Sequence, residues 1–428
     1  MFQIYKQSLS LNMRISSTVA ASALLAVASA ADSTNYLGFN SGATKADRSA
    51  KFKADFKAEF DAAANLKGAP GDFNAVRLYT NIQAYSDSDP IEAFDAAVET
   101  KTKLLLGVWA SGTDNIDKEL SALKKGIEKH GSKLTDLVIG ITIGSEDLYR
   151  ISETGIKNKS GVGNSPKAIV GFIENFRSSF KSTALAKVPV GHADTWDAWG
   201  NSTNKAVIDN VDFIAVHEYP YYETGKGNSI DNAAKLFQTA YDNTLAAAGS
   251  KPVWVTETGW PYTGPDWDQA KSGTDNAKKY WQEVGCKKLF NKVPTFWYTL
   301  RDSNPDNEVK FAITDNLSTT PRFNLSCDGI KEDDKSSSTS KSGSSSATKT
   351  GSSTASKTPG GDDSDSTTLA TATPTPSSGN SNGGSGTTTT GASASQTSGP
   401  ASSAPGQKIF NAYTYAALAV VGAAFAMF

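Results

Sequence analysis

The sequence predicts an α/β fold, a (β/α)8 TIM barrel that is followed by a disordered Ser/Thr-rich stalk. Three observations support this fold class. Eight short segments rich in β-branched or aromatic residues alternate with helical patterns, an order that favours parallel strands. The body that contains them has about 300 residues, close to the roughly 250 of a typical barrel. No G-x-G-x-x-G follows a strand-like segment, so a doubly wound, dinucleotide-binding sheet has no support.

Each predicted strand is a short run in which β-branched and aromatic residues are frequent. Between most of the runs lies a segment of helical character. In chain order we expect strands at Tyr36–Asn40, Ala75–Thr80, Lys103–Trp109, Leu137–Ser145, Val188–Asp194, Asp212–Tyr219, Pro252–Thr258 and Thr295–Arg301.

Helical patterns fill most of the gaps between these strands. Phe52, Phe56 and Phe60 recur every four residues, which predicts one apolar stripe on a helix. The stretch 196–210 carries only a weak pattern, and no clear helix follows the eighth strand. Further helices are expected at Ile91–Lys101, Ile116–His130, Lys167–Leu185, Asn232–Ala248 and Asp275–Phe290.

The composition excludes several classes of function. The 42 basic and 44 acidic residues nearly cancel, to a net charge of −2, whereas a nucleic-acid binder normally has a strong basic excess. Three His and two Cys are too few for a Cys-rich zinc or iron–sulfur protein. We therefore expect no nucleic-acid partner and no metal centre. We also expect no organic cofactor, and a protein that acts as a monomer.

The N-terminal residues 1–30 have the pattern of a secretory signal peptide. Positive charge precedes an apolar core, Val19 to Val27, and the small residues Ala28 to Ala30 form a cleavage pattern. This core is shorter than the roughly 20 residues that span a bilayer. Met13 serves as well as Met1 as the start of such a signal. A buried core helix is the alternative interpretation.

The C-terminal residues 403–428 have the pattern of a glycosylphosphatidylinositol (GPI) attachment signal. An apolar tail, Ala412 to Phe428, ends the chain with no Lys or Arg after it, and a polar spacer and small residues precede it. We place the attachment residue within 398–406, with Ser402 as the expected site. The lipid would hold the protein at a membrane. A single tail-anchored transmembrane helix is the alternative.

A segment rich in Ser, Thr, Gly and Pro, residues 329–402, separates this signal from the body. It has almost no large apolar residue, so it cannot bury enough surface to offset the entropy lost on ordering. Such a composition is typical of an O-glycosylated stalk, with a bare flexible linker as the alternative. Residues 31–328 then form the barrel domain that the stalk holds away from the membrane.

Two strands of the predicted barrel end in a carboxylate. Glu146 follows the fourth strand, and Glu257 lies at the end of the seventh. Active sites of such barrels lie at the carboxyl ends of the strands, and the fourth and seventh strands face each other. Glycoside hydrolysis requires two carboxylates in one cleft, and a separation of about 5–5.5 Å would give retention of configuration. The alternative for either Glu alone is a solvated loop acid.

Residues 256–261, Thr-Glu-Thr-Gly-Trp-Pro, resemble the nucleophile motif of glycoside hydrolase family 17, and the resemblance covers roughly residues 33–327. That family contains β-1,3-glucan endohydrolases and glucanosyltransferases of plants and fungi, including fungal cell-wall members with a stalk and a lipid anchor. The resemblance implies that Glu257 is the nucleophile and Glu146 the proton donor. It also implies a sugar-binding residue just before the acid, usually Asn and here Ser145, whose hydroxyl can still form a hydrogen bond.

Other polar residues near the strand ends are candidates for substrate binding. Arg77 and Tyr79 share one face of the second strand, and an Arg within reach would keep the nucleophile ionised. The family resemblance implies that Tyr79 lines the sugar site. His217 and Tyr219 share one face of the sixth strand, where the Tyr could hydrogen-bond the nucleophile. Glu218 points the other way and is not included, and ordinary packing is the alternative for His217 and Tyr219.

Three tryptophans are candidates for stacking on sugar. Trp109, Trp260 and Trp297 close the third, seventh and eighth strands. Indole faces suit the apolar faces of glucose rings, so we expect these residues in the substrate site. Ordinary core packing is the alternative for each.

The cysteines and sequons carry two further predictions. Cys286 and Cys327 are the only cysteines, and an even count in a secreted protein suggests a disulfide, with two free thiols as the alternative. It would close a loop of roughly 40 residues, worth about 4 kcal/mol on the chain-entropy model. We expect some of the N-x-Ser/Thr sequons to carry a glycan, and these begin at Asn158, Asn201, Asn316 and Asn324.

Together these features predict a secreted, GPI-anchored, retaining endo-hydrolase of β-1,3-glucan that acts in remodelling of a fungal cell wall. Glucanosyl transfer is a second outcome of the same chemistry, and the sequence does not decide between them. Two alternatives stay open. One is a catalytically silent glucan-binding or adhesion protein on the same barrel, because fold does not imply function. The other is a β-1,4-glycan hydrolase.

Overall fold

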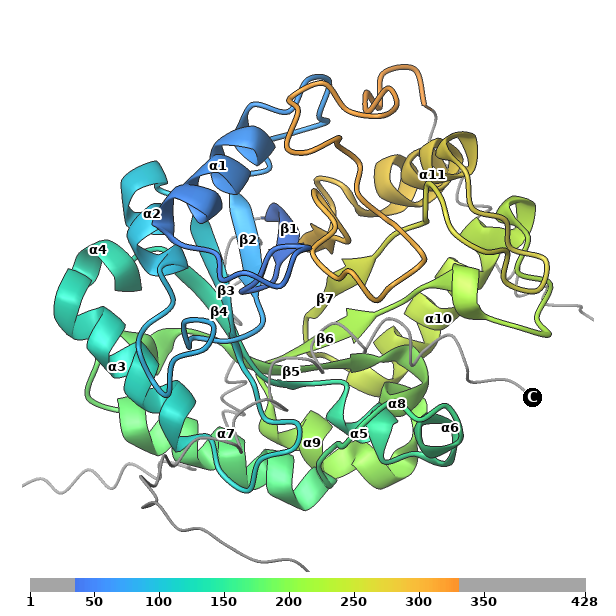
Figure 1. The fold of residues 1–428 in the computed structure, drawn as a ribbon. Helices are drawn as coiled ribbons and strands as arrows, with labels where there is room; N and C mark the ends of the chain where they lie inside the picture. The colour runs from blue at the N-terminus through green and yellow to red at the C-terminus, as the bar shows by residue number, and fades with distance from the viewer. Residues whose placement is uncertain (1–34, 331–428) are drawn as a thin grey trace, which may run out of the picture. The chain divides into compact units, whose positions relative to one another are not determined.

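The computed structural model describes residues 35–330, in which eight parallel strands close into a barrel in the order β1 to β8. β8 completes the ring by pairing with β1, with Leu37 opposite Thr295 and Phe39 opposite Trp297. Helices surround the strands on the outside (Figure 1). The predicted (β/α)8 barrel is confirmed. The predicted signal peptide, the GPI signal and the stalk beyond residue 330 lie outside the described residues.

All eight predicted strands are present, with ends that differ from the predictions by at most four residues. β6 ends at His217 rather than Tyr219, because Pro220 begins a 3₁₀ turn and cannot donate to a strand ladder. The strands are β1 (Leu37–Ser41), β2 (Ala75–Leu78), β3 (Lys103–Val108), β4 (Val138–Ser145), β5 (Val190–Thr195), β6 (Phe213–His217), β7 (Val253–Thr258) and β8 (Thr295–Trp297).

The connections are mainly helical. The start of helix α7 follows from its sequence. The Ser165 hydroxyl accepts a hydrogen bond from the Ala168 amide, and Pro166 suits the first helical position. The helices are α1 (Lys53–Ala64), α2 (Ala93–Thr100), α3 (Asp117–His130), α4 (Ser132–Thr135), α5 (Asp147–Arg150), α6 (Glu153–Lys157), α7 (Pro166–Phe180), α8 (Trp196–Gly200), α9 (Lys205–Asn210), α10 (Ile230–Ala248) and α11 (Thr274–Tyr280). The 3₁₀ turns are η1 (Ala184–Lys187), η2 (Ser202–Asn204) and η3 (Pro220–Tyr222), and η4 (Trp281–Leu289) is π-helical.

Several helix predictions differ from the structure, including Asp275–Phe290, which is π-helical from Trp281. Phe52 has an extended backbone, precedes α1 and is 53% exposed, so only Phe56 and Phe60 of the predicted stripe are buried. The predicted helix Lys167–Leu185 gives way to η1 before its end. The weak stretch 196–210 contains the short helices α8 and α9. Short helices bury few side chains, which is why their apolar period is hard to detect in the sequence.

The described segment after β8 contains no helix and is fastened to the barrel in two ways. Cys286 of η4 and Cys327 form the expected disulfide, with their Cα atoms 5.4 Å apart. Trp281 is fully buried beside Trp297 and donates its indole N–H to the carbonyl of Leu325 at 2.9 Å. These contacts take the place of an eighth outer helix.

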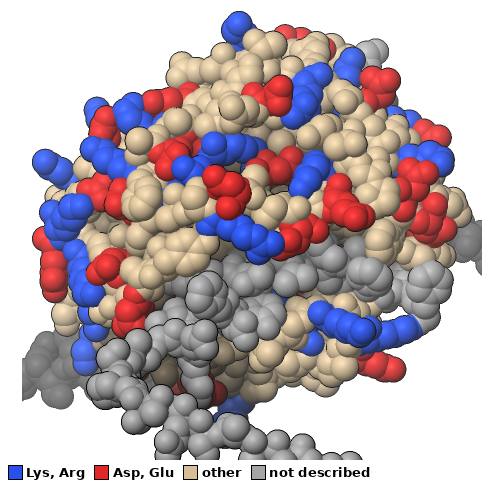
Figure 2. All heavy atoms as spheres, in the orientation of Figure 1, with Lys and Arg blue, Asp and Glu red and all other residues tan. Residues whose placement is uncertain are grey.

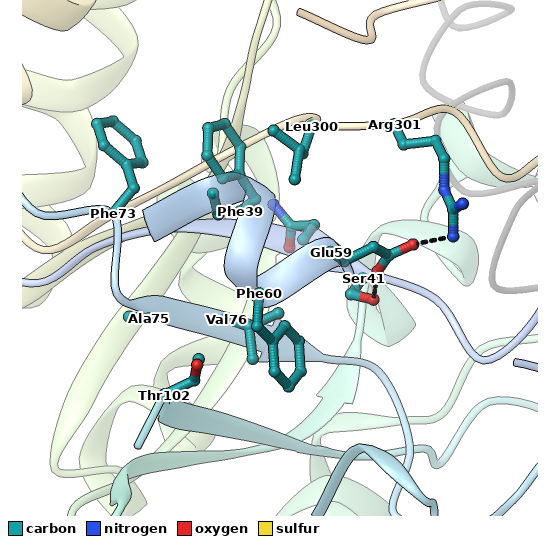
Figure 3. A pocket seen from close by; sticks show the side chains of 12 residues that line it. Phe39, Ser41, Glu59, Phe60, Phe73, Ala75, Val76, Thr102, Leu300 and Arg301 are labelled. Atoms are coloured by element: carbon teal, nitrogen blue, oxygen red, sulfur yellow. Dashed lines mark hydrogen bonds and ion pairs between the residues drawn. The ribbon is translucent and has the colours of Figure 1, made fainter. Parts of the chain in front are cut away.

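A buried ionic cluster joins β1, α1 and the segment after β8. Glu59 of α1 accepts a hydrogen bond from Ser41 at 2.6 Å and pairs with Lys51 at 2.7 Å. Arg301 donates to the same carboxylate (Figure 3). Burial opposes ionisation of Glu59, but Lys51 and Arg301 outweigh it and hold its pKa below the ordinary value. The cluster therefore stays charged and fixes the carboxyl end of β1.

Charged side chains of both signs are mixed over the face shown in Figure 2, in keeping with the near-zero net charge. Exposed ion pairs such as Arg48 with Asp306 contribute little to stability. Within residues 35–330, no helix has both the length and the apolar character that a membrane span requires.

Candidate active site

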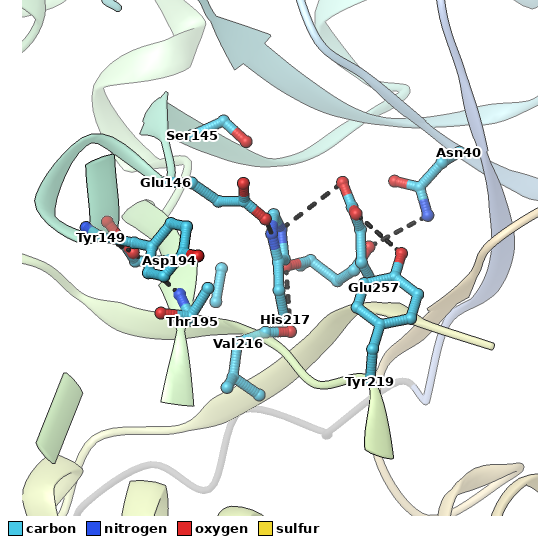
Figure 4. Close-up of polar contacts among 12 residues, drawn as sticks. Asn40, Ser145, Glu146, Tyr149, Asp194, Thr195, Val216, His217, Tyr219 and Glu257 are labelled. Carbon is cyan, nitrogen blue, oxygen red and sulfur yellow. Dashed lines mark hydrogen bonds and ion pairs between the residues drawn. The ribbon is translucent and has the colours of Figure 1, made fainter. Parts of the chain in front are cut away.

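The candidate site lies at the carboxyl ends of the strands, where four buried polar side chains meet. Glu257 lies in β7, Arg77 in β2 and His217 at the end of β6, and Glu146 directly follows β4. Each of the four is at most 2% exposed. Figure 4 shows the carboxyl groups of Glu146 and Glu257 directed toward His217 from either side. The structure thus brings together the two carboxylates singled out in the sequence.

Three donors hold the carboxylate of Glu257. Arg77 donates to Oε1 at 2.5 Å, Tyr79 donates to the same oxygen at 2.7 Å, and Tyr219 donates to Oε2 at 2.8 Å. The guanidinium of Arg77 also lies 4.5 Å from the centroid of the Tyr79 ring. A carboxylate held by a cation and two hydroxyl groups stays ionised and keeps one orientation.

Arg77 is itself fixed by neighbours on β1 and β4. It donates to Oδ1 of Asn40 at 3.0 Å and to the hydroxyl of Ser145 at 3.1 Å. The Asn40 amide in turn donates to the carbonyls of Thr256 and Phe296, both at 3.1 Å. Sequence reasoning missed Asn40. The available signal was an Asn within an otherwise apolar strand, where a buried amide needs partners.

Glu146 lies in a turn with a left-handed backbone, at φ 59° and ψ 26°. One carboxyl oxygen is 2.9 Å from Nδ1 of His217, and the other is 3.9 Å from a guanidinium nitrogen of Arg150. Its backbone amide donates to the carbonyl of Ala193 at 2.8 Å. A residue other than Gly rarely adopts this conformation unless its surroundings hold it there. The turn therefore sets the direction of the Glu146 side chain.

Two buried aspartates hold the turn that carries Glu146. Asp147 accepts a hydrogen bond from the Ser145 amide at 3.0 Å. Asp194 of β5 accepts from two amides of α5, at 2.9 and 3.2 Å, and pairs with Nε2 of His192 at 2.9 Å. These contacts tie β4, α5 and β5 together directly behind Glu146.

The two central carboxyl groups have opposed pKa shifts. Burial raises the pKa of Glu146 above its ordinary value, and His217 offsets only part of that rise. Burial also acts on Glu257, but His217, Arg77 and the two tyrosine hydroxyls outweigh it and hold its pKa below the ordinary value. At a pH between the two values, one group is an acid and the other an anion. Acid and nucleophile roles require this division.

The separation of the two central carboxyl groups is closer to that of retaining than to that of inverting glycosidases. An oxygen of Glu146, an oxygen of Glu257 and a ring nitrogen of His217 all lie within 4.8 Å of one another. Inverting pairs lie about 6.5–9.5 Å apart, and retaining pairs about 5–5.5 Å apart. The same three groups have the donor atoms of a metal site, but a cation there would face the guanidinium of Arg77, 2.5 Å from Glu257. Because this guanidinium already neutralises Glu257, the group does not form a free cation site.

The structure corrects the exclusion of Glu218 from the site. Strand alternation predicts that Glu218 points away, but β6 ends at His217 and the alternation ends with it. Glu218 is 2% exposed and lines a cavity of about 290 Å³ that Glu146, His217 and Tyr219 also line. The predicted strand extends two residues too far, to Tyr219, and for this reason Glu218 was assigned to the wrong face.

The three tryptophans expected to stack on sugar are buried. Trp109, Trp260 and Trp297 are 7%, 2% and 2% exposed. The guanidinium of Arg150 lies 5.5 Å from the Trp109 ring, and Tyr280 packs beside both Trp260 and Trp297. Core packing accounts for the positions of Trp260 and Trp297. A role of the three in sugar binding stays a prediction.

The structure separates one sequon from the other three. Asn201, Asn316 and Asn324 are exposed. Asn158 is 5% exposed, and its amide donates to the hydroxyl of Tyr149 at 2.8 Å. A glycan on that nitrogen would have to displace the packing around it, which favours the other three sequons, and glycosylation stays a prediction. The expected GPI attachment at Ser402 lies outside the described residues.

Residues 38–313 match the family described as the BtgE/BtgC glycoside hydrolase domain. One curated relative, the probable glucan endo-1,3-beta-glucosidase eglC of Aspergillus niger, is 49% identical over 307 residues, which cover 71% of this chain and 66% of the relative. The protein of the same name from Aspergillus terreus is 47% identical over 324 residues, 74% of this chain and 64% of the relative. The chain thus spans just under two thirds of the length of these relatives.

Solved structures show the same fold. A glycoside hydrolase family 17 beta-1,3-glucanosyltransferase from Rhizomucor miehei aligns with a TM-score of 0.55 at 24% identity, over 69% of this chain and 98% of that chain. An endo-laminarinase from Formosa aligns with a TM-score of 0.54 at 15% identity, over 65% of this chain and 83% of that chain. At such identities the likeness concerns the fold alone.

Proposed function

The chain belongs to the family of BtgE/BtgC glycoside hydrolase domains, and on this premise we propose that it is a retaining endo-hydrolase of β-1,3-glucan. The observation that carries the proposal is the buried pair Glu146 and Glu257, with opposed pKa shifts and with oxygens within 4.8 Å. The substrate class follows the relatives, which are named probable glucan endo-1,3-beta-glucosidases.

In the first half of the proposed reaction, Glu257 is the nucleophile. Its carboxylate oxygen bonds to the anomeric carbon of a glucose residue, and the bond from that carbon to the bridging oxygen breaks. Glu146 gives its proton to the departing oxygen, which leaves as a sugar hydroxyl. Arg77, Tyr79 and Tyr219 keep the attacking carboxylate ionised and oriented.

In the second half, Glu146 acts as a base. It accepts a proton from water, the water oxygen bonds to the anomeric carbon, and the ester bond to Glu257 breaks. Two inversions leave the configuration unchanged. A hydroxyl group of a second glucan can replace water in this step, and the product is then a longer chain. Hydrolysis and glucanosyl transfer therefore share one intermediate and differ in the acceptor.

A glucan-binding protein without activity fits the site less well. Binding alone does not require one carboxyl group held neutral by burial within 4.8 Å of a second one held ionised by a buried arginine. The arrangement has an obvious use only when a proton and a nucleophile act on the same bond.

We also propose that the protein is secreted and held at the fungal cell wall by a GPI anchor. The support is the sequence of residues 1–30 and 329–428. An anchored enzyme meets an insoluble polymer that cannot diffuse to it. A chain that ends at residue 328 is expected to keep its activity on soluble glucan and to lose its association with the wall.

Incubation with a β-1,3-linked glucose pentamer tests the proposed activity, with the products separated by size. The expected result is shorter products from the wild type and none from Glu257→Gln. Glu174→Gln, which changes an exposed carboxylate of α7, is the matched control and should behave as wild type. Products longer than the pentamer would show that transfer also occurs. No turnover of the pentamer by the wild type would contradict the proposal.

A further inference from the structure

A second pair of buried carboxyl groups lies next to the central site. Glu218 follows β6 and Glu223 follows η3, and they are 2% and 6% exposed. Burial raises the pKa of Glu218 well above its ordinary value, and the neighbouring carboxyl group of Glu223 raises it further. The ammonium of Lys226 lies 3.2 Å from Glu223. Glu218 in its protonated form can donate a hydrogen bond to the adjacent carboxyl group of Glu223.

Both groups line the cavity of about 290 Å³ whose wall includes Glu146. This cavity gathers buried polar atoms that have no hydrogen-bond partner among the described residues. They are the hydroxyl of Tyr222, Oε2 of Glu146, and both oxygens of Glu218 with Oε1 of Glu223, which have no partner there besides one another. A buried polar atom without a partner costs about 1–3 kcal/mol, so folded proteins seldom collect several of them in one place.

The chemistry of this wall suits a ligand with several hydroxyl groups. A carboxyl pair whose one proton lies between its two groups offers several acceptor sites, and the Tyr222 hydroxyl can both donate and accept. Each hydroxyl group of a sugar is likewise a donor and an acceptor. Water can serve these atoms in the free protein, and a sugar can replace it at little enthalpic cost.

The position of the cavity relative to the reaction identifies which sugar would occupy it. Its lining includes Glu146 but not Glu257 or Arg77. In the proposed reaction, Glu146 contacts the oxygen that departs with the leaving chain, whereas Glu257 bonds to the sugar that stays. A sugar that touches Glu146 away from Glu257 is therefore on the leaving side of the bond.

We propose that this cavity binds the glucose residue on the leaving side of the cleaved bond, with Glu218 and Glu223 as its hydroxyl-binding pair. The inference rests on the proposed function and adds a substrate-positioning site to it. Because an acceptor chain enters from the same side in the second half of the reaction, the pair also holds the acceptor in transfer. Glu218 and Glu223 thereby influence how often a glucan replaces water.

Two substrates that differ only in their leaving group separate this site from the catalytic carboxylates. One is the β-1,3-linked glucose pentamer, whose leaving group is a sugar. The other is an aryl glycoside of the β-1,3-linked trimer, whose leaving group has no sugar hydroxyls. In the full chain, Glu218→Gln and Glu223→Gln are expected to lower kcat/KM for the pentamer about tenfold more than for the aryl glycoside, with KM for the pentamer raised. Glu174→Gln is the control.

Tyr222→Phe is a second test of the site, for the case that the variants of the buried glutamates do not fold. The variant removes one hydroxyl that has no hydrogen-bond partner among residues 35–330, so its thermal unfolding should match that of the wild type. It is expected to raise KM for the pentamer more than KM for the aryl glycoside. Equal effects on both substrates in this variant, or none, would overturn the inference while the proposed function stands. A wild type that turns over neither substrate would contradict the proposed function, and the inference with it.

Discussion

Arg77 and Glu257 form an ion pair in which Nη1 and Oε1 are 2.5 Å apart, and their side chains are only 1% and 2% exposed. Burying two charges is costly, and their attraction compensates only when further hydrogen bonds complete the site. Here Asn40 accepts a further hydrogen bond from Arg77. Tyr79 and Tyr219 donate hydrogen bonds to the carboxylate of Glu257. We interpret the pair as the device that keeps Glu257 anionic at the pH where Glu146 still holds its proton.

Arg77→Gln should move the acid side of the pH profile. Without the guanidinium, burial dominates and the pKa of Glu257 rises, so a larger share of the enzyme is protonated and inactive at low pH. In a profile of kcat/KM against pH, the acid limb should shift upward by about one unit or more. Arg77→Lys, which keeps the charge, should shift it less. An unchanged acid limb in Arg77→Gln would contradict the assigned role.

Glu146→Gln should remove proton donation without removing the nucleophile. The loss of kcat/KM on β-1,3-glucan should be about 10²- to 10⁴-fold. An aryl glycoside whose leaving group needs no proton should lose much less in its first step. In the wild type, activity should fall on the alkaline side as Glu146, with its raised pKa, becomes ionised. A variant that keeps this alkaline limb would show that another group supplies the proton.

Glu119 should make stability depend on pH. Its carboxyl group is buried in α3, accepts hydrogen bonds from Thr80 and from the Asn81 amide, and burial raises its pKa to about 7. The unfolded chain releases this proton near pH 4.5 and the folded protein keeps it, so the free energy of unfolding falls between about pH 4.5 and 7, by up to about 3 kcal/mol.

Glu119→Gln is neutral at every pH and should lack this part of the pH dependence. Urea unfolding of the wild type and the variant, at about pH 5 and about pH 7.5, measures the difference. The fall in the free energy of unfolding between the two values should be smaller in the variant. Equal falls would show that Glu119 does not keep its proton in the folded state.

Removal of the disulfide should destabilise the fold without touching the site. Cys286 and Cys327 are 41 residues apart, and a cross-link over such a loop is worth about 4 kcal/mol on the chain-entropy model. The double variant Cys286→Ser, Cys327→Ser should show a lower midpoint of urea unfolding and an unchanged pH profile of activity. An unchanged midpoint would mean that the contacts around Trp281 hold the last segment by themselves.

The fold could be predicted from the sequence because its determinants are local. Each strand is a compact run of β-branched and aromatic residues, and the alternation with helices implies parallel order. The predictions were wrong where neighbours in space decide the outcome. Phe52 fits the four-residue period of α1, yet its backbone is extended and its ring is exposed.

The site could be predicted only in part. Carboxylates at two strand ends are visible in the sequence, so Glu146 and Glu257 were found with their strands. Asn40 and Glu218 were missed, because their importance depends on barrel closure and on where β6 stops. The contact between Arg77 and the Ser145 hydroxyl joins residues 68 positions apart, and no local pattern encodes it.

The anomeric configuration of the first product tests the central claim most directly. Proton NMR, recorded during the first minutes of hydrolysis and before mutarotation, shows whether the new reducing end is the β or the α anomer. If Glu257 attacks the anomeric carbon and Glu146 then activates water, the β anomer must appear first. Initial appearance of the α anomer would mean that water attacks directly, and Glu257 would not be the nucleophile.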